Sequence, residues 1–168
     1  MKIRLEQPAD AGAIAAVLTA AFGQPAEAQL VDRIRQSDRA WIGWVAEQDG
    51  AIVGHVLLSA VDCVGESRRS VWALAPLAVH PIAQRQGIGT ALVKAAIEQA
   101  EQTDYPFIVV LGHPEFYARC GFEPAGDQGV AAPFPASPPA FRIRRLPAYV
   151  AQAGQIDYPA AFAPVSPS

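Results

Sequence analysis

The stretch Gln84-Arg85-Gln86-Gly87-Ile88-Gly89-Thr90 decides how the rest of the chain is interpreted. It follows Val71 to Val79, an uncharged apolar run typical of a strand covered on both faces of a sheet. It precedes Ile88 to Ala96, where apolar residues recur at helical spacing. The first N–H groups of a helix point outward at such a junction, and the two glycines remove Cβ atoms that would keep an anion away. The stretch therefore predicts a phosphate site, to which Arg85 can add a charge-assisted contact.

The glycine pattern alone leaves two interpretations open, because an ordinary capped loop explains it as well as a phosphate site does. Two other phosphate motifs are disfavoured. A P-loop requires Gly-Lys-Ser or Gly-Lys-Thr, which the sequence lacks. The dinucleotide fingerprint requires a third glycine where this chain has Leu92, and an acidic residue near the end of the next strand, where it has Leu111 and Gly112.

The pattern elsewhere mixes strands and helices. Asp10 is a candidate N-cap, a second helix starts near Glu27, and Asp49-Gly50 is a hairpin-turn signal. Recurrent prolines between Pro124 and Pro159 predict loops around a single strand. Strands are expected at residues 2–6, 41–47, 52–59, 71–79, 107–111 and 141–146, and helices after residue 10, at 27–36, from 88 and from 114.

Length and composition favour one domain with one core. We expect a single domain over residues 1–168, with its core at about 2–147 and a proline-rich C-terminal extension at 148–168. The formal charge of -3 gives no electrostatic reason to expect nucleic acid or an anionic membrane as a partner. Cys63 and Cys120 lack metal-ligand spacing, so we expect reduced thiols and no metal. No stretch approaches the ~18 apolar residues of a membrane span, and we expect a soluble, cytoplasmic protein.

Two ordered motifs resemble those of the GNAT-type N-acetyltransferase family. Gln84-x-x-Gly87-x-Gly89, preceded by Leu77-Ala78-Val79-His80-Pro81, resembles its acetyl-CoA motif, and Gly112-His113-Pro114-Glu115-Phe116-Tyr117-Ala118-Arg119-Cys120-Gly121-Phe122 resembles its Phe-Tyr-x-x-x-Gly-Phe element. The tail at 156–162 is similar to the ending of the YhbS-like subgroup. The resemblance covers about 2–147 and implies an α/β fold with a mixed, mostly antiparallel central sheet, split into a V and flanked by helices, with the pantetheine arm in the cleft.

The resemblance also implies an enzyme that transfers acetyl from acetyl-CoA to a primary amine of a small molecule or protein by direct attack. It assigns the backbone of Leu77, Ala78 and Val79 to the pantetheine and acetyl groups. Phe116 belongs to the same cofactor site. His113, where the family often has Asn, either caps the following helix or touches the pantetheine. The pyrophosphate is assigned to the amides of Gln84, Arg85, Gln86, Gly87, Ile88, Gly89 and Thr90.

Tyr117 falls on the family's usual general acid, whose phenol protonates the departing CoA thiolate. Composition alone favours a tyrosine that only packs, but the motif reverses this preference. Cys120 is interpreted as a small buried hydrophobe rather than a nucleophile, because no base is evident beside it.

The general base is not identified by the sequence. The central strand carries Ala73 where some relatives have a glutamate, so the candidates are Glu27, His55 and His80, acting directly or through water. Because no base is obvious, a non-catalytic acyl-CoA-binding sensor is the alternative function. The acceptor stays unnamed, and the oligomeric state stays open between a monomer and a homodimer.

Overall fold

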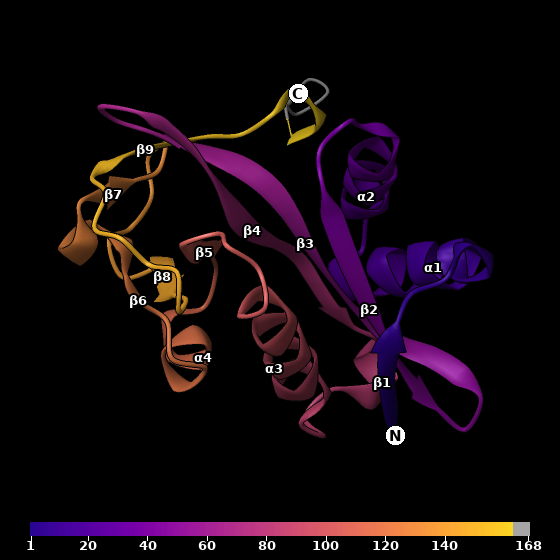
Figure 1. Ribbon diagram of the computed structural model, residues 1–168. Helices are drawn as coiled ribbons and strands as arrows, with labels where there is room; N and C mark the ends of the chain where they lie inside the picture. The colour runs from indigo at the N-terminus through magenta and orange to yellow at the C-terminus, as the bar shows by residue number, and fades with distance from the viewer. Residues whose placement is uncertain (163–168) are drawn as a thin grey trace. The chain divides into compact units, whose positions relative to one another are not determined.

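Two long strands, β3 (Ala51–Val64) and β4 (Arg68–Val79), contribute residues to both of the units into which the chain divides. Unit 1 contains residues 1–59 and 74–99, and unit 2 contains residues 60–73 and the chain from residue 100 onward. The computed structural model describes residues 1–162 (Figure 1). The end of the expected C-terminal extension, residues 163–168, lies outside the described residues.

In unit 1 a sheet lies between helices on its two faces. Strand β1 pairs antiparallel with β2, and β2 pairs antiparallel with β3. Strand β4 is hydrogen-bonded to β3. Figure 1 shows α1 and α2 on one face of these strands and α3 on the other. The bounds are β1 Lys2–Leu5, α1 Ala11–Phe22, α2 Ala26–Gln36, β2 Trp41–Gln48 and α3 Ile88–Ala100, with a short 3-10 turn, η1, at Pro8–Asp10.

The helices of unit 1 dock through the apolar faces that their sequences predict. Helix α1 buries Ile14, Val17 and Leu18 and ends at Gly23, whose φ of 70° suits glycine. Helix α3 packs closely on β3, because Gly54 leaves room for it. A Cβ at Gly54 would lie 2.9 Å from Leu92 Cδ1, so the glycine sets the distance between helix and strand.

A buried polar cluster lies on the α1 and α2 face of the same sheet. His55 is fully buried, and its Nε2 lies 2.8 Å from Glu6 Oε1, while Arg35 Nη2 donates to Glu6 Oε2 at 2.7 Å. Gly43 makes the room, since a Cβ there would clash with the Glu6 carboxylate. Burial lowers the pKa of His55 despite its hydrogen bond to Glu6, and its Nδ1 has no partner among the described residues. His55 is therefore neutral, because a charged ring would bury an N–H donor that bonds to nothing.

Replacing Glu6 with glutamine should lower the free energy of unfolding by about 3 kcal/mol, because the change leaves the mostly buried Arg35 without its main counter-charge. The Glu6 side chain is 6% exposed in this ion pair. Asp32→Asn is the matched control, since Asp32 also pairs with Arg35 but its side chain is 63% exposed. It should change stability by less than about 0.5 kcal/mol. Urea unfolding measures both, and equal losses would contradict the importance of the buried pair.

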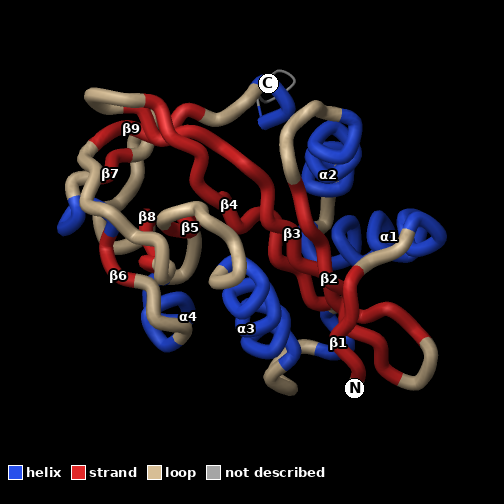
Figure 2. Tube along the Cα trace, viewed as in Figure 1, coloured by secondary structure: helices blue, strands red, loops and turns tan. Residues whose placement is uncertain are grey.

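Unit 2 contains the remaining strands around its own core. Strand β4 pairs parallel with β5, β8 pairs antiparallel with both β5 and β6, β9 pairs antiparallel with β3, and β7 pairs parallel with β9 (Figure 2). The bounds are β5 Phe107–Leu111, α4 Pro114–Arg119, β6 Glu123–Pro124, β7 Val130–Ala131, β8 Phe141–Arg145 and β9 Gly154–Asp157, with 3-10 turns η3 at Ala125–Gln128 and η4 at Ala160–Phe162.

The core of unit 2 combines residues that are distant in sequence. Phe107 and Ile143 on paired strands are fully buried, and so is Ile156 on β9. Arg68 donates to Asp62 at 2.6 Å and to Asp157 at 3.0 Å, which ties the start of β4 to β3 and β9. The C-terminal segment is thus held in unit 2 by both apolar and ionic contacts.

The expected fold class is confirmed, since helices flank a mostly antiparallel mixed sheet, and the expected strands and helices are all present. Three strands, β6, β7 and β9, are additional to the expectation. The expected N-cap position of Asp10 is confirmed, but its side chain does not cap the helix. Asp10 occupies the N-cap position of α1 but makes no side-chain cap bond there, because its carboxylate accepts from Gln7 N at 2.7 Å and pairs with Arg4 at 2.7 Å.

Candidate functional site

The predicted phosphate segment forms the connection between β4 and α3 in unit 1. After β4 ends at Val79, a 3-10 turn, η2, covers Pro81–Ala83, and α3 begins at Ile88. Gln84 Nε2 donates to the Val79 carbonyl at 3.1 Å, which folds the loop back onto the end of the strand. The loop therefore has a fixed path from the strand to the first turn of the helix.

The start of α3 presents backbone donors in an exposed position. Gly87 O accepts the hydrogen bond of Ala91 N at 3.1 Å, so the preceding helical amides lie in the first turn, where a helix offers them no acceptor. The side chains at positions 84–86 are exposed, whereas Ile88 is buried and anchors the turn. Both Arg85, with φ 64°, and Gly87, with φ 80°, adopt the left-handed conformation. Such a run of exposed amides is suited to an anion.

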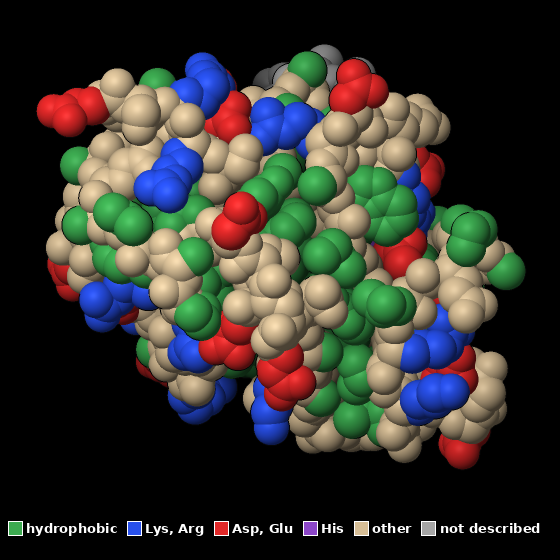
Figure 3. Space-filling model, viewed as in Figure 1, with side chains coloured by type: hydrophobic (Ala, Val, Ile, Leu, Met, Phe, Trp, Pro, Cys, Tyr) green, Lys and Arg blue, Asp and Glu red, His purple; other side chains and the backbone are tan. Residues whose placement is uncertain are grey.

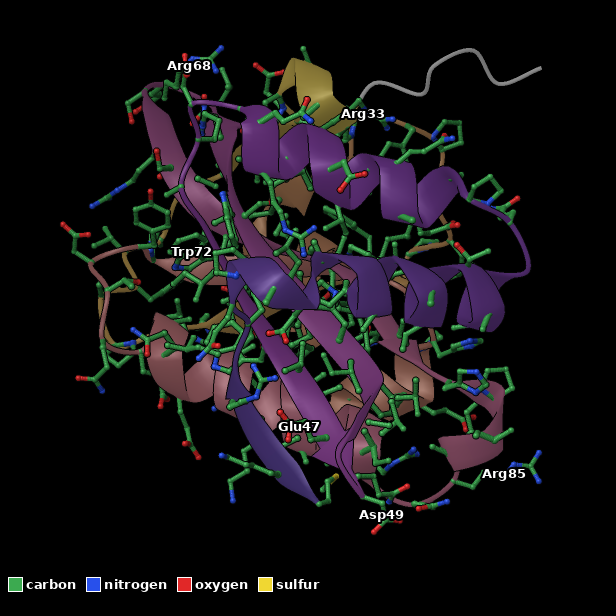
Figure 4. All side chains as sticks on the ribbon, turned by 90° about the vertical axis from the view of Figure 1, so that its right-hand side faces the viewer. Arg33, Glu47, Asp49, Arg68, Trp72 and Arg85 are labelled. Atoms are coloured by element: carbon green, nitrogen blue, oxygen red, sulfur yellow. The ribbon has the colours of Figure 1, made fainter. Side chains whose placement is uncertain are left out.

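Arg85 adopts a backbone conformation that favours glycine, and its side chain extends outward in Figure 4. Arg85→Gly should therefore be more stable to urea than Arg85→Ala by about 1 kcal/mol, because glycine removes the left-handed strain while alanine keeps it. Both variants should weaken CoA binding to the same degree, by about tenfold, since both lose the charge. Isothermal titration with CoA provides the second measurement, and undiminished affinity in both variants would exclude the arginine from the phosphate contact.

Tyr117 lies in unit 2 on α4, where it is held by its neighbours. Its ring meets Phe116 at a centroid distance of 4.9 Å and Phe122 at 5.5 Å, both edge to face. A Cβ at Gly112 would lie 2.6 Å from Tyr117 Cε2, so the ring packs directly on the backbone at the end of β5. The residue is 7% exposed. Pro114 occupies the start of α4, as expected, and Gly121 follows its end with φ 86°.

The phenol of Tyr117 is a proton donor at neutral pH. Burial raises its pKa above the ordinary value of a tyrosine, and Cys120 adds to the rise. Within residues 1–162 no group accepts a hydrogen bond from its hydroxyl. The side chain therefore keeps its proton and leaves its donor free, as a general acid requires.

The surroundings of His113 and Cys120, two neighbours of Tyr117, decide part of what the sequence predicts for them. His113 is exposed and stands at the N-cap of α4, but its side chain makes no cap hydrogen bond, so the capping alternative is wrong. Its carbonyl accepts from Tyr117 N at 3.2 Å instead. Cys120 is half buried rather than buried, and burial raises the pKa of its thiol despite the nearby Arg119 and Arg144. A protonated thiol is not a nucleophile, which agrees with the interpretation from sequence.

The candidates for the general base are separated by their surroundings. His55 is completely buried and bound to Glu6, so it cannot touch an acceptor amine directly. His80 Nδ1 accepts from Ile82 N at 3.3 Å and caps η2. Glu27 lies in the first turn of α2 and accepts from Gln24 Nε2 at 3.2 Å. All three candidates lie in unit 1. Ala73 is buried on β4. An alanine has no carboxylate, so this position supplies no general base.

A surface groove of about 460 Å³ lies elsewhere in unit 1, between β1 and α3. Figure 3 shows hydrophobic side chains gathered over this face. The groove is wide open and contains none of the predicted site residues, so we do not assign the predicted chemistry to it. Its lining residues are Ile3, Arg4, Leu5, Trp44, Ala95, Glu98 and Gln99.

Three further features bear on the predictions of partners and metals. Among residues 1–162, no helix has both the length and the apolar character needed to cross a bilayer. In the same residues no three His, Cys, Asp or Glu side chains are grouped to hold a metal ion. Cys63 and Cys120 are both free.

Comparison with known proteins identifies the family. The model of the Acetyltransferase (GNAT) family matches residues 13–122. The chain is 37% identical over 147 residues to the uncharacterized N-acetyltransferase YhbS of Escherichia coli K12, with 87% of each chain covered. The structure of Escherichia coli YhbS in complex with CoA aligns with a TM-score of 0.89 and 34% identity, covering 96% of this chain and 91% of that one.

A GNAT family acetyltransferase from Brucella melitensis, solved in complex with acetyl-CoA, aligns with a TM-score of 0.79 and 29% identity, covering 96% of this chain and 97% of that one. The chain therefore belongs to the GNAT family of acetyltransferases. Within that family its similarity to YhbS extends over most of both chains. The resemblance drawn from the two sequence motifs is thus confirmed.

Proposed function

We propose that this acetyltransferase uses acetyl-CoA as its donor and acetylates a primary amine. The observation that carries the proposal is the exposed turn at the start of α3, where Arg85 and Gly87 adopt positive φ and backbone amides lack helical acceptors. The relatives solved with CoA and acetyl-CoA support the same donor. The amides of residues 84–90 bind the pyrophosphate, and the backbone of residues 77–79 binds the pantetheine arm.

The chemistry is a direct transfer. The neutral amine attacks the thioester carbonyl, a C–N bond forms, and the C–S bond breaks as the intermediate collapses. Tyr117 gives its proton to the departing sulfur, and the proton lost by the attacking nitrogen returns to the phenolate through solvent. The products are an N-acetyl amide and CoA with a free thiol. The protonated, unpaired phenol of Tyr117 supports this role.

A non-catalytic acyl-CoA sensor is the second candidate. The observation in its favour is that His55 is sealed from solvent and that Ala73 stands where some relatives have a carboxylate, so neither position supplies a general base. The free donor of Tyr117 opposes it, because a sensor needs no acid at the thiolate. The two free cysteines, Cys63 and Cys120, suit a reducing compartment, and we therefore propose a cytoplasmic location. The homodimer stays a prediction.

Two measurements test the proposed function. Acetyl-CoA should raise the melting temperature, because a ligand at 100 times its dissociation constant stabilises the folded state by ~2.7 kcal/mol, and NADH should not. CoA release should then be followed across a panel of primary amines. Release with at least one amine supports the enzyme, and binding without release supports the sensor. No shift with millimolar acetyl-CoA, or an equal shift with NADH, would refute the donor assignment.

A further inference from the structure

Arg142, on β8 in unit 2, buries its guanidinium against backbone carbonyls. The residue is 8% exposed. Its Nε and Nη2 donate to Phe122 O at 3.2 and 2.9 Å, and its Nη1 donates to Pro139 O at 2.9 Å. Among the described residues no carboxylate forms an ion pair with it. Burying a cation without a counter-charge costs free energy of folding. The place of the two carbonyls that bind it therefore indicates what the arginine does.

One carbonyl belongs to Phe122, whose ring contacts that of Tyr117, and the other belongs to Pro139, next to a residue that is bonded to Gly112. Phe122 N donates to Tyr117 O at 3.0 Å, and the two rings meet edge to face. Pro139 immediately precedes Ala140, whose carbonyl accepts from Gly112 N at 3.1 Å. The Tyr117 ring packs on the backbone of Gly112. The guanidinium is therefore bonded to the Phe122 segment, which forms one wall of the slot around the ring, and to the segment that is hydrogen-bonded to Gly112, which forms a second wall.

From this arrangement we infer that Arg142 is a positioning residue for Tyr117, which fixes the direction of the phenol by holding both walls of its slot. The inference rests on the acid role proposed for Tyr117. An arginine suits the task because its planar fork presents several donors in fixed directions and reaches two carbonyls at once. A small displacement of an acid from its acceptor atom is enough to cost rate.

The kinetic test compares Arg142→Met in two backgrounds. With acetyl-CoA and the fastest amine of the panel, the substitution should lower kcat by about tenfold in the parent but less than about twofold in Tyr117→Phe, because positioning has no value once the hydroxyl is absent. The KM for acetyl-CoA should not change, and Arg142→Lys should recover part of the rate. Equal losses in both backgrounds would overturn the inference. A full rate in Tyr117→Phe alone would instead contradict the acid role.

Arg145→Met is the matched control, because it removes the same charge from the same strand. The Arg145 side chain is 51% exposed and pairs with Glu123 at 2.6 Å. The Arg145→Met substitution should change kcat by less than about twofold in either background, since exposed ion pairs contribute little to stability. A tenfold loss in this variant as well would assign the effect to net charge and overturn the inference.

A second readout does not depend on turnover. The four tyrosines are replaced by 3-fluorotyrosine, and a ¹⁹F spectrum is recorded. The resonance of Tyr117 is identified as the one that is missing from the spectrum of the Tyr117→Phe variant. Arg142→Met should move this resonance, whereas Arg145→Met should move that of Tyr149, because the Arg145 guanidinium lies 5.6 Å from the Tyr149 ring. An unmoved Tyr117 resonance in a folded Arg142→Met variant would overturn the inference. If the Met variant does not fold, Arg142→Lys is judged by the same criterion.

Discussion

Tyr117→Phe should lower kcat by on the order of a hundredfold while the dissociation constant of acetyl-CoA changes little. The substitution keeps the ring that packs on Gly112 and against Phe122, and removes only the hydroxyl that is free to donate. Steady-state kinetics with an accepted amine and titration calorimetry with acetyl-CoA measure the two quantities. The loss should shrink with an acyl donor whose leaving thiol is more acidic, because that thiolate needs less protonation.

Tyr149→Phe is the matched control for this prediction. The Tyr149 hydroxyl donates to Gln128 at 3.2 Å within unit 2, so its removal costs a structural hydrogen bond and leaves the rate nearly unchanged. If Tyr117→Phe turns over at the parental rate while chemistry is rate-limiting, Tyr117 is structural, and water or another residue protonates the thiolate.

Gly89→Glu should weaken CoA binding by on the order of a hundredfold, which corresponds to the loss of one or two charge-assisted hydrogen bonds. Gly89 lies in the first turn of α3, and a carboxylate there opposes the pyrophosphate while its side chain covers the exposed amides. Glutamate is tolerated in a helix, so the fold should survive. Calorimetry with CoA measures the affinity, and circular dichroism verifies the fold.

Gly12→Glu controls for the introduction of a charged side chain at a helical glycine. Gly12 lies in the first turn of α1, and a Cβ there would meet nothing within 4 Å. This variant should bind CoA as the parent does. A folded Gly89→Glu variant with parental affinity would show that the phosphate site has been placed wrongly.

Elements with a regular buried face are predictable from local sequence, and elements that depend on distant partners are not. Strand β5 is an uninterrupted apolar run and is expected at its observed bounds. The sequence does not predict β9, which has four residues and gains its stability from pairing with Cys63 and its neighbours, far away in the chain. Strand β3 extends to Val64, beyond the expected end, because Arg68 compensates Asp62 where the apolar pattern breaks.

The same distinction applies to the candidate site. The phosphate segment and Tyr117 belong to short contiguous motifs, so the resemblance to the family assigns both of them from the sequence, and their roles stay predictions. The Glu6 and His55 pair joins residues 49 apart, and burial of the histidine excludes it from direct contact with an acceptor. Arg142 stands in a strand whose alternating arginines suggest an exposed basic face. Its burial depends on Phe122, 20 residues earlier, which no local pattern indicates.

The interleaving of the two units along the chain sets the order in which they are completed during synthesis. Unit 1 uses no residue beyond 99, so all of its parts are available while the second half of the chain is still being made. Unit 2 has to wait for β9, which pairs with β3 from Asp62 to Val64. Until β9 emerges from the ribosome, this part of β3 lacks that partner and presents open backbone groups to other nascent chains. We therefore expect chaperones to contact the far end of the β3 and β4 hairpin late in translation.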